Sequence, residues 1–235
     1  ASGVGESTFA TATDAEVAQA IETSDAAFGS WRAKSVADRA AMLHRVADLY
    51  VERTDELAAL ITREMGKTLA EAVDEVDYSV DIYRYYADHG PALLADEPLP
   101  STSDGRALVR KAAVGPLLGI MPWNYPYYQV ARFAGPNLMA GNTILLKHAP
   151  QCPESALAME QLFRDAGLVS GEYINLFATN EQVADIIADP RVRGVSVTGS
   201  ERAGTAVAAA AGANLKKVVL ELGGSDAFIV LDAPD

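Results

Sequence analysis

The sequence predicts an α/β fold in which a doubly wound parallel sheet follows a helical N-terminal region. Residues 14–94 place apolar side chains at helical spacings of three and four. Prolines, serines and a glycine break that rhythm over residues 91–105. After Pro116, short apolar runs alternate with helix-like segments. This alternation is typical of a parallel sheet with helices on both of its faces.

The apolar positions of the N-terminal region indicate core-facing helices. The helical faces are formed by Met42, Leu43, Val46, Leu49 and Tyr50, then Leu57, Leu60 and Ile61, then Tyr78, Ile82, Tyr85 and Tyr86. Asp14 and Asp38 are candidate N-caps, and Gly66 is a candidate helix end. We interpret these helices as scaffold, because apolar side chains at such spacings are mostly buried core.

The remaining elements follow from the apolar runs and the turn residues between them. Arg106–Lys111 is an expected exposed strand after the break. The expected sheet strands are Leu117–Met121, Thr143–Lys147, Tyr173–Leu176, Gly194–Val197 and Lys217–Glu221. The expected helices between them are Tyr127–Met139, Glu154–Ala166, Glu181–Ala188 and Glu201–Ala211. Right-handed crossovers would place every strand's carboxyl end at one edge, where α/β proteins bind ligands.

Composition excludes several classes of function. The 235 residues are 49% hydrophobic and 22% charged, as in a globular protein. A net charge of −13 argues against binding to nucleic acid or to an anionic membrane. No apolar run approaches the roughly 20 residues of a membrane span, and Ala1–Phe9 lacks the features of a secretory signal. The single cysteine, Cys152, suits a reducing cytoplasm. No metal-ligand set is predicted.

Polar residues stand where two of the expected strands end. Pro122-Trp123-Asn124 follows the first strand, and an amide held at such a corner can donate to a developing oxyanion. Glu221 ends the last strand before Leu222 and two glycines. Because Glu221 follows three apolar residues we expect it to be partly buried, which would make it a stronger general base. A strand-end glutamate in a simple turn is the alternative.

Two further features suit an anionic ligand. Ser200 is a good N-cap for the helix that follows Thr198-Gly199, and a helix N-terminus attracts phosphate. The spacing to Gly204 is G-x-x-x-x-G rather than the dinucleotide fingerprint, so close helix–sheet packing remains an alternative. Lys147 ends a strand beside this helix and is either a cation for a nucleotide or a solvated strand end.

Arg132 lies on an otherwise apolar helix ten residues after Pro122. Its planar guanidinium suits a carboxylate ligand. A structural ion pair, or an arginine whose stem covers apolar surface, is the alternative.

The Pro-Trp-Asn corner, Thr198-Gly199-Ser200 and Glu221-Leu222-Gly223-Gly224 together resemble the aldehyde dehydrogenase superfamily over essentially the whole chain. The resemblance implies an NAD(P)-binding domain and makes Asn124 the oxyanion donor and Glu221 the general base. It implies cofactor contacts from Met121, Pro122, Trp123, Asn124, Lys147, His148, Ala149, Pro150, Thr198, Gly199, Ser200, Gly204 and Leu222. Ser200 would bond the pyrophosphate and Lys147 the adenosine ribose.

Arg132 and the stretch Leu146–Ala149 resemble bacterial succinate-semialdehyde dehydrogenases in particular, in which the arginine binds the substrate's distal carboxylate. Many NAD-preferring relatives carry a glutamate where this chain has Pro150. Without that carboxylate a 2′-phosphate meets no repulsion, and Lys147 with His148 could attract it. The expected cofactor is therefore NADP or NAD, with NADP slightly favoured. The expected substrate is a small aldehyde with a distal carboxylate.

The resemblance also implies a division of the chain. Residues 1–105 would form the helical part of the cofactor-binding domain, with an oligomerisation hairpin near 96–112. Residues 113–224 would be the Rossmann-like core, and 225–235 would begin the catalytic domain. The family's catalytic cysteine is expected after Asp235, since Cys152 is placed on the adenosine side, away from the acyl site, as a small hydrophobe. The chain alone would then be inactive, and the full enzyme a homodimer or homotetramer.

Two alternatives stay open from sequence. The chain could be a nucleotide-binding or structural module with no catalysis of its own, or part of an acyl-phosphate reductase of related fold. A cysteine encoded soon after Asp235 distinguishes the enzyme from the module, and phosphate-dependent turnover identifies the reductase.

Overall fold

The computed structural model describes residues 7–100 and 104–231. Its elements, in chain order, are α1 (Asp14–Ala33), α2 (Val36–Glu52), α3 (Thr54–Met65), α4 (Leu69–Leu93), β1 (Glu97–Leu99), β2 (Ala107–Val109), β3 (Pro116–Met121), α5 (Pro126–Ala140), β4 (Thr143–His148), α6 (Pro153–Asp165), β5 (Tyr173–Asn175), α7 (Asn180–Ala188), β6 (Gly194–Thr198), α8 (Glu201–Ala213) and β7 (Lys217–Glu221). Every expected sheet strand is present, with bounds shifted by at most about one residue, as is usual at element ends.

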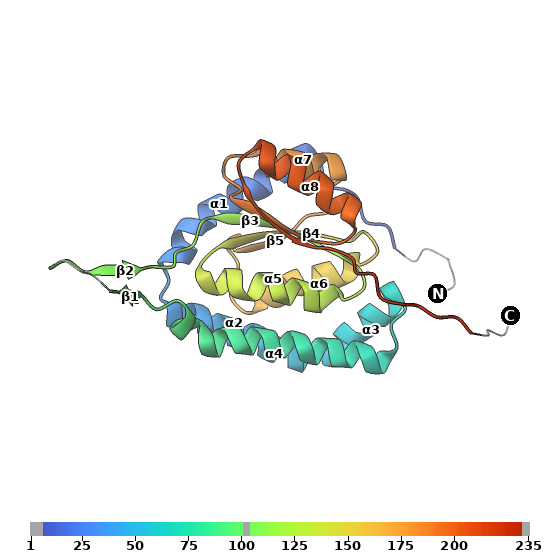
Figure 1. The fold of residues 1–235 in the computed structure, drawn as a ribbon. Coiled ribbons are helices and arrows are strands. Elements are labelled where there is room, and N and C mark those ends of the chain that lie inside the picture. The colour runs from blue at the N-terminus through green and yellow to red at the C-terminus, as the bar shows by residue number, and fades with distance from the viewer. Residues whose placement is uncertain (1–6, 101–103, 232–235) are drawn as a thin grey trace.

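The main sheet has five strands in the order β5-β4-β3-β6-β7, and all four pairings are parallel. Helices α1, α7 and α8 cover one face, and α5 and α6 cover the other (Figure 1). The predicted doubly wound α/β fold is therefore confirmed. The register places Met121 opposite His148 and Thr198 opposite Glu221, so these carboxyl ends share one edge.

Helices α2, α3 and α4 form a further layer outside α5 and α6 (Figure 1). A large core cluster fills the space between these helices and the sheet, and it includes the fully buried Tyr50, Tyr83, Tyr127 and Phe163. A smaller cluster lies under α1, α7 and α8. The scaffold role predicted for the N-terminal helices is confirmed, and α4 packs directly against α5. The prediction is wrong for Tyr78 and Tyr85, which are 55% and 51% exposed.

The predicted N-caps Asp14 and Asp38 are wrong, because the residues that cap these two helices come slightly earlier in the chain. Thr13 caps α1, and Ser35 caps α2 through a 3.0 Å bond from the Asp38 backbone N–H to the Ser35 hydroxyl. Asp14 and Asp38 instead lie within the first turns, where carboxylates interact favourably with the helix dipole. Gly66 ends α3 with a φ of 81°, as predicted for a left-handed cap.

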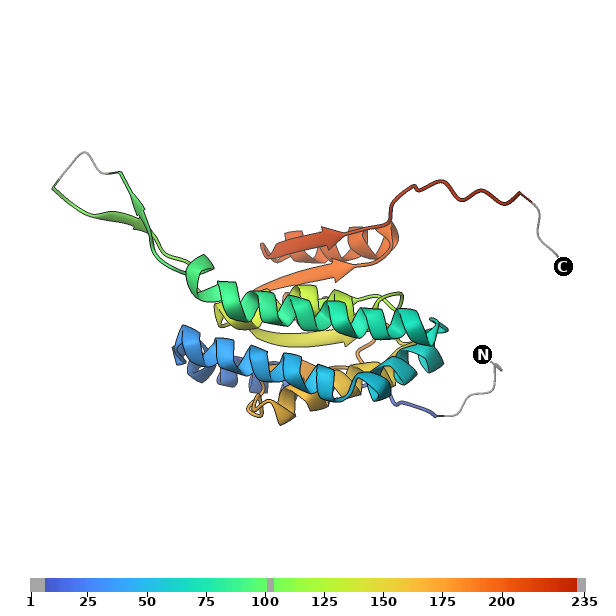
Figure 2. The same cartoon turned by 90° about the horizontal axis from the view of Figure 1, so that it is seen from below.

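The predicted hairpin is present as β1 and β2, which pair antiparallel and consist of exposed residues. It projects from the body on the side away from the extended segment that follows β7 (Figure 2). At the base of the hairpin, Arg110 donates to both carboxylate oxygens of Asp96 at 2.8 and 2.5 Å.

Within the described residues, no helix is both long enough and apolar enough to cross a bilayer. Expectations for residues 1–6, 101–103 and 232–235 lie outside the described part.

Candidate functional site

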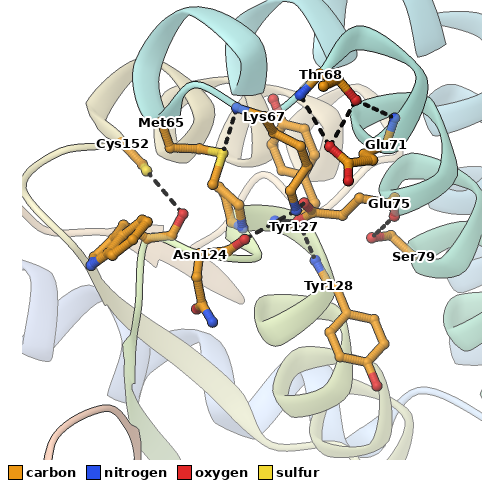
Figure 3. Close-up of polar contacts among 12 residues, drawn as sticks. Met65, Lys67, Thr68, Glu71, Glu75, Ser79, Asn124, Tyr127, Tyr128 and Cys152 are labelled. Carbon is orange, nitrogen blue, oxygen red and sulfur yellow. Dashed lines mark hydrogen bonds and ion pairs between the residues drawn. The ribbon is translucent and has the colours of Figure 1, made fainter. Parts of the chain in front are cut away.

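The corner between β3 and α5 presents three exposed side chains at the carboxyl edge of the sheet. Trp123 and Tyr125 are 48% and 42% exposed, and Asn124 lies between them. Figure 3 shows the Asn124 amide directed away from the polar cluster beneath the corner. The corner therefore offers an amide and two aromatic surfaces to a ligand.

Two charged residues from the helical layer hold this corner from inside. Glu75 of α4 is fully buried and accepts the backbone N–H groups of Tyr127 and Tyr128 at 2.8 and 3.2 Å (Figure 3). Its other oxygen pairs with the Lys67 ammonium at 2.5 Å. Lys67 also donates to the carbonyl of Asn124 at 3.0 Å. Because α5 lacks a side-chain cap of its own, Glu75 supplies the acceptors that its first turn needs.

The N-terminus of α6 is satisfied in the same way. Both carboxylate oxygens of Glu64 accept backbone N–H groups, from Glu154 at 2.6 Å and from Ser155 at 3.0 Å. Burial raises the pKa of Glu64, and its bonds to Ser155 act in the opposite sense. The N-termini of α5 and α6 are thus occupied by carboxylates of the protein itself.

The N-terminus of α8 differs from those of α5 and α6, because its cap is a residue of its own segment and its first residues are exposed to solvent. Ser200 is the N-cap, as predicted, and its hydroxyl accepts the N–H of Ala203 at 3.3 Å. Ser200, Glu201 and Arg202 are exposed. Within the described residues no carboxylate accepts the first N–H groups of α8, in contrast to α5 and α6, so this N-terminus suits an external anion best among the three.

Gly204 has a packing role. A Cβ at this position would lie 2.5 Å from Cδ2 of Leu222, so the glycine lets Leu222 rest directly on α8. This favours the close-packing interpretation of the G-x-x-x-x-G spacing. Thr198 ends β6 at the edge, and the N–H of Gly199 donates to the Glu221 carbonyl at 3.0 Å.

The last two residues of β4, Lys147 and His148, differ in how far their side chains are buried. Lys147 is half-buried, and burial lowers its pKa. His148 is 5% exposed, and its Nε2 lies 3.0 Å from the Pro126 carbonyl. Burial lowers the pKa of His148, which keeps the ring neutral. Both expectations for this side chain, phosphate contact and surface exposure, are therefore wrong, because strand alternation turns it under α5. Ala149 is partly buried and Pro150 is exposed.

Cys152 lies closer to the corner than expected. It is fully buried, and its thiol donates toward the Trp123 carbonyl at 3.8 Å. Burial, with smaller effects from the carboxylates of Glu64 and Glu75, raises its pKa to about 12. The expected remote position is wrong, whereas the expected character of a small buried hydrophobe is confirmed. A neutral, buried thiol is not a nucleophile.

Arg132 and Glu221 face a hollow of about 430 Å³ between α5 and the strands β3, β6 and β7. Their nearest charged atoms are 3.6 Å apart, and Arg132 also donates to Gln129 at 3.1 Å. The side chains are 41% and 52% exposed. The expected partial burial of Glu221 is wrong, because β7 is the outermost strand and the described residues do not cover it.

The structure thus gathers Asn124, Lys147, Ser200 and Glu221 along one edge, while the side chains of His148 and Cys152 point into the interior. Sequence reasoning missed Lys67, Glu75 and Glu64. For Glu75 a signal existed, because it falls on the buried face of α4 that also carries Ala72, Val76 and Ser79. Within the described residues, no group of His, Cys, Asp or Glu side chains could hold a metal ion.

Fold and site together define an α/β protein whose candidate ligand-binding groups line the carboxyl edge of a parallel sheet. A family model described as "Aldehyde dehydrogenase family" matches residues 4–235, and the chain belongs to this family. A succinate-semialdehyde dehydrogenase [NADP(+)] of Deinococcus radiodurans is 55% identical over 228 residues, which cover 97% of this chain and 48% of that protein. A succinate semialdehyde dehydrogenase [NAD(P)+] of Escherichia coli is 44% identical over 220 residues, or 94% of this chain and 47% of that protein.

Solved structures agree with the fold. A succinic semialdehyde dehydrogenase from Streptococcus pyogenes, in complex with NADP+ as the cofactor, aligns with a TM-score of 0.91 at 44% identity. That alignment covers 97% of this chain and 50% of the other. The chain spans about half the length of the curated relatives it matches.

Proposed function

We propose that the protein containing this chain oxidises an aldehyde bearing a distal carboxylate, most simply succinate semialdehyde to succinate, with NADP+ or NAD+. The observation that carries the proposal is the meeting of Asn124, the open N-terminus of α8 and Glu221 at one sheet edge. The balanced reaction takes up one aldehyde, one oxidised cofactor and one water. It releases the acid, the reduced cofactor and a proton.

The residues present fit a dinucleotide. The N-terminus of α8 is accessible whereas those of α5 and α6 are capped internally, so a pyrophosphate has one natural position among the three. Lys147 places a cation at the end of β4, which is separated from β6 by β3 at the same edge of the sheet. When bound, the cofactor supplies the acceptor for hydride. Thr198, Gly199 and Ser200 would line the path between pyrophosphate and the corner.

Two residues of this chain would have different roles in the reaction. Asn124 would donate its amide hydrogen to the oxyanion that forms when a thiolate attacks the aldehyde carbon. Glu221 would accept a proton from the thiol or from the water that later hydrolyses the thioester. Cys152, the sequence's only cysteine, is buried and protonated, so the proposal assigns the nucleophile to a residue outside these 235. We expect the isolated 235 residues to bind cofactor without turnover.

Two observations favour NADP over NAD. Pro150 is exposed at the position where a carboxylate would repel a 2′-phosphate, and Lys147 is close by in the chain. The relatives from D. radiodurans and S. pyogenes are described with NADP+, and that from E. coli with NAD(P)+. The buried His148 contributes nothing to this preference.

The proposal extends to assembly. The β1–β2 hairpin projects beyond the body and exposes Leu99, Leu108 and Val109, which suits a contact with another copy of the enzyme (Figure 2). We assign the hairpin to a homodimer or homotetramer, and residues 113–224 to the cofactor-binding core. The single cysteine suits a reducing cytoplasm.

The substrate assignment is tested with Arg132→Leu in the complete protein. Kinetics would be compared for succinate semialdehyde and for butanal, which has the same carbon number without the carboxylate. Loss of a charge-assisted bond worth about 1.5–3 kcal/mol should raise KM for succinate semialdehyde about 10- to 100-fold and leave butanal unaffected. Arg164→Leu is the matched control, because Arg164 is also an exposed arginine with an ion pair at 3.6 Å and does not line the hollow. An equal change in KM for both aldehydes would show that Arg132 does not bind the substrate's carboxylate.

A further inference from the structure

Lys67 and Glu75 take no part in the chemistry described above, yet they bond to the backbone of the corner on both sides of Tyr125 (Figure 3). The Lys67 side chain is 9% exposed and the Glu75 side chain 0%. The Lys67 ammonium meets three groups: Glu75 at 2.5 Å, the Asn124 carbonyl at 3.0 Å, and the Tyr125 ring, whose centroid is 3.6 Å away.

These contacts act on both sides of Asn124. Lys67 holds the carbonyl of Asn124 toward the interior, while Glu75 holds the N–H groups of Tyr127 and Tyr128 that begin α5. With its carbonyl pulled inward and the following turn anchored, the backbone of Asn124 has little freedom. The side-chain amide of the same residue then points outward, as Figure 3 shows. Charge-assisted bonds in a buried site are strong enough to maintain such a geometry.

We propose that Lys67 and Glu75 form a clamp that positions the Asn124 amide for the oxyanion. They are positioning residues, since neither lies where substrate or cofactor would touch it. The inference rests on the role proposed for Asn124. It predicts that the clamp acts on the rate of the chemical step rather than on binding, because a misplacement of about 1 Å can cost up to about 100-fold in rate.

The test is a double-mutant cycle in the complete protein. Lys67→Met removes the ammonium and keeps the length of the side chain, and Asn124→Ala removes the amide. We expect Asn124→Ala to lower kcat about 100-fold or more, and Lys67→Met about 10- to 100-fold. The double variant should be no slower than Asn124→Ala, because Lys67 has no amide left to position. KM for the aldehyde and Kd for NADP+ should change little.

A second variant and a spectroscopic measurement keep the test decisive if Lys67→Met does not fold. Glu75→Gln retains an acceptor for the α5 N–H groups but removes the charge that orients Lys67, and it should show the same lack of additivity with Asn124→Ala. Iodide quenching of Trp123, taken as the difference between each protein and its Trp123→Phe counterpart, reports the corner directly, because Trp123 is 48% exposed. Quenching should change in the clamp variants and not in Arg84→Met, which removes an exposed ion pair of α4.

The outcomes separate the two proposals. Additive losses in the cycle, or a kcat unchanged by both clamp variants, would overturn the clamp and leave the role of Asn124 intact. An unchanged kcat in Asn124→Ala would overturn both the role of Asn124 and the clamp that depends on it.

Discussion

Gly119→Ala is expected to destabilise the protein through one contact between β3 and α5. The new Cβ would lie 2.4 Å from Cε1 and 2.7 Å from Cδ1 of the Phe133 ring. Carbon atoms pack at about 3.5–4.0 Å, so the ring, and α5 with it, must move by about 1 Å. Overpacking of this kind costs about 1–3 kcal/mol in the free energy of unfolding, and the corner at the start of α5 would move with the helix.

Urea unfolding of three variants measures this cost. Phe133→Leu alone should destabilise by about 1 kcal/mol or somewhat more, as deletion of buried carbon does. The double variant Gly119→Ala/Phe133→Leu should be more stable than the sum of the single effects by about 1 kcal/mol, because the smaller side chain relieves the clash. Gly29→Ala is the matched control, since a Cβ there meets nothing within 4 Å. It should stabilise by about 0.5–1 kcal/mol.

The reasoning is refuted if Gly119→Ala behaves like Gly29→Ala. It is also refuted if the effects of Gly119→Ala and Phe133→Leu add to within about 0.5 kcal/mol. Either result would mean that the ring of Phe133 does not press on β3.

Further predictions concern the two buried groups beneath the corner. Because burial raises the pKa of Cys152 to about 12, iodoacetamide should leave it unmodified in the native chain at neutral pH and label it after denaturation; labelling at equal rates would contradict its burial. Because burial lowers the pKa of His148, the unfolded state binds a proton first as pH falls below about 6.5, and stability should decline there. His148→Gln should flatten that decline in pH-dependent melting, and an unchanged slope would show that another group causes it.

Local sequence signals predicted the elements well, because strands such as β4 and β7 are apolar runs bounded by turn residues. They predicted the N-caps less well, since Thr, Ser and Asp all suit an N-cap, and it is the extended backbone of Thr13 and Ser35 that makes these two the caps. A cap is defined by that conformation rather than by residue type alone.

Local sequence patterns could not predict burial that depends on the order of the strands or on the packing of the helices. The apolar residues before Glu221 suggested burial, but β7 lies at the sheet's edge. His148 follows a strand and looked exposed, but α5 covers it. The clamp of Lys67 and Glu75 joins residues more than fifty positions apart in sequence, and such a contact appears only once the layers are assembled.

The central claim is that the corner of β3 and α5 stabilises the oxyanion of an aldehyde oxidation. The most direct measurement is kcat for NADPH formation from succinate semialdehyde by Asn124→Ala and by Asn124→Asp, in the complete protein. The account predicts that both variants lose about 100-fold or more in kcat, with melting temperatures near that of the unaltered protein. A kcat within about threefold of the unaltered protein, a difference of well under 1 kcal/mol, would contradict it.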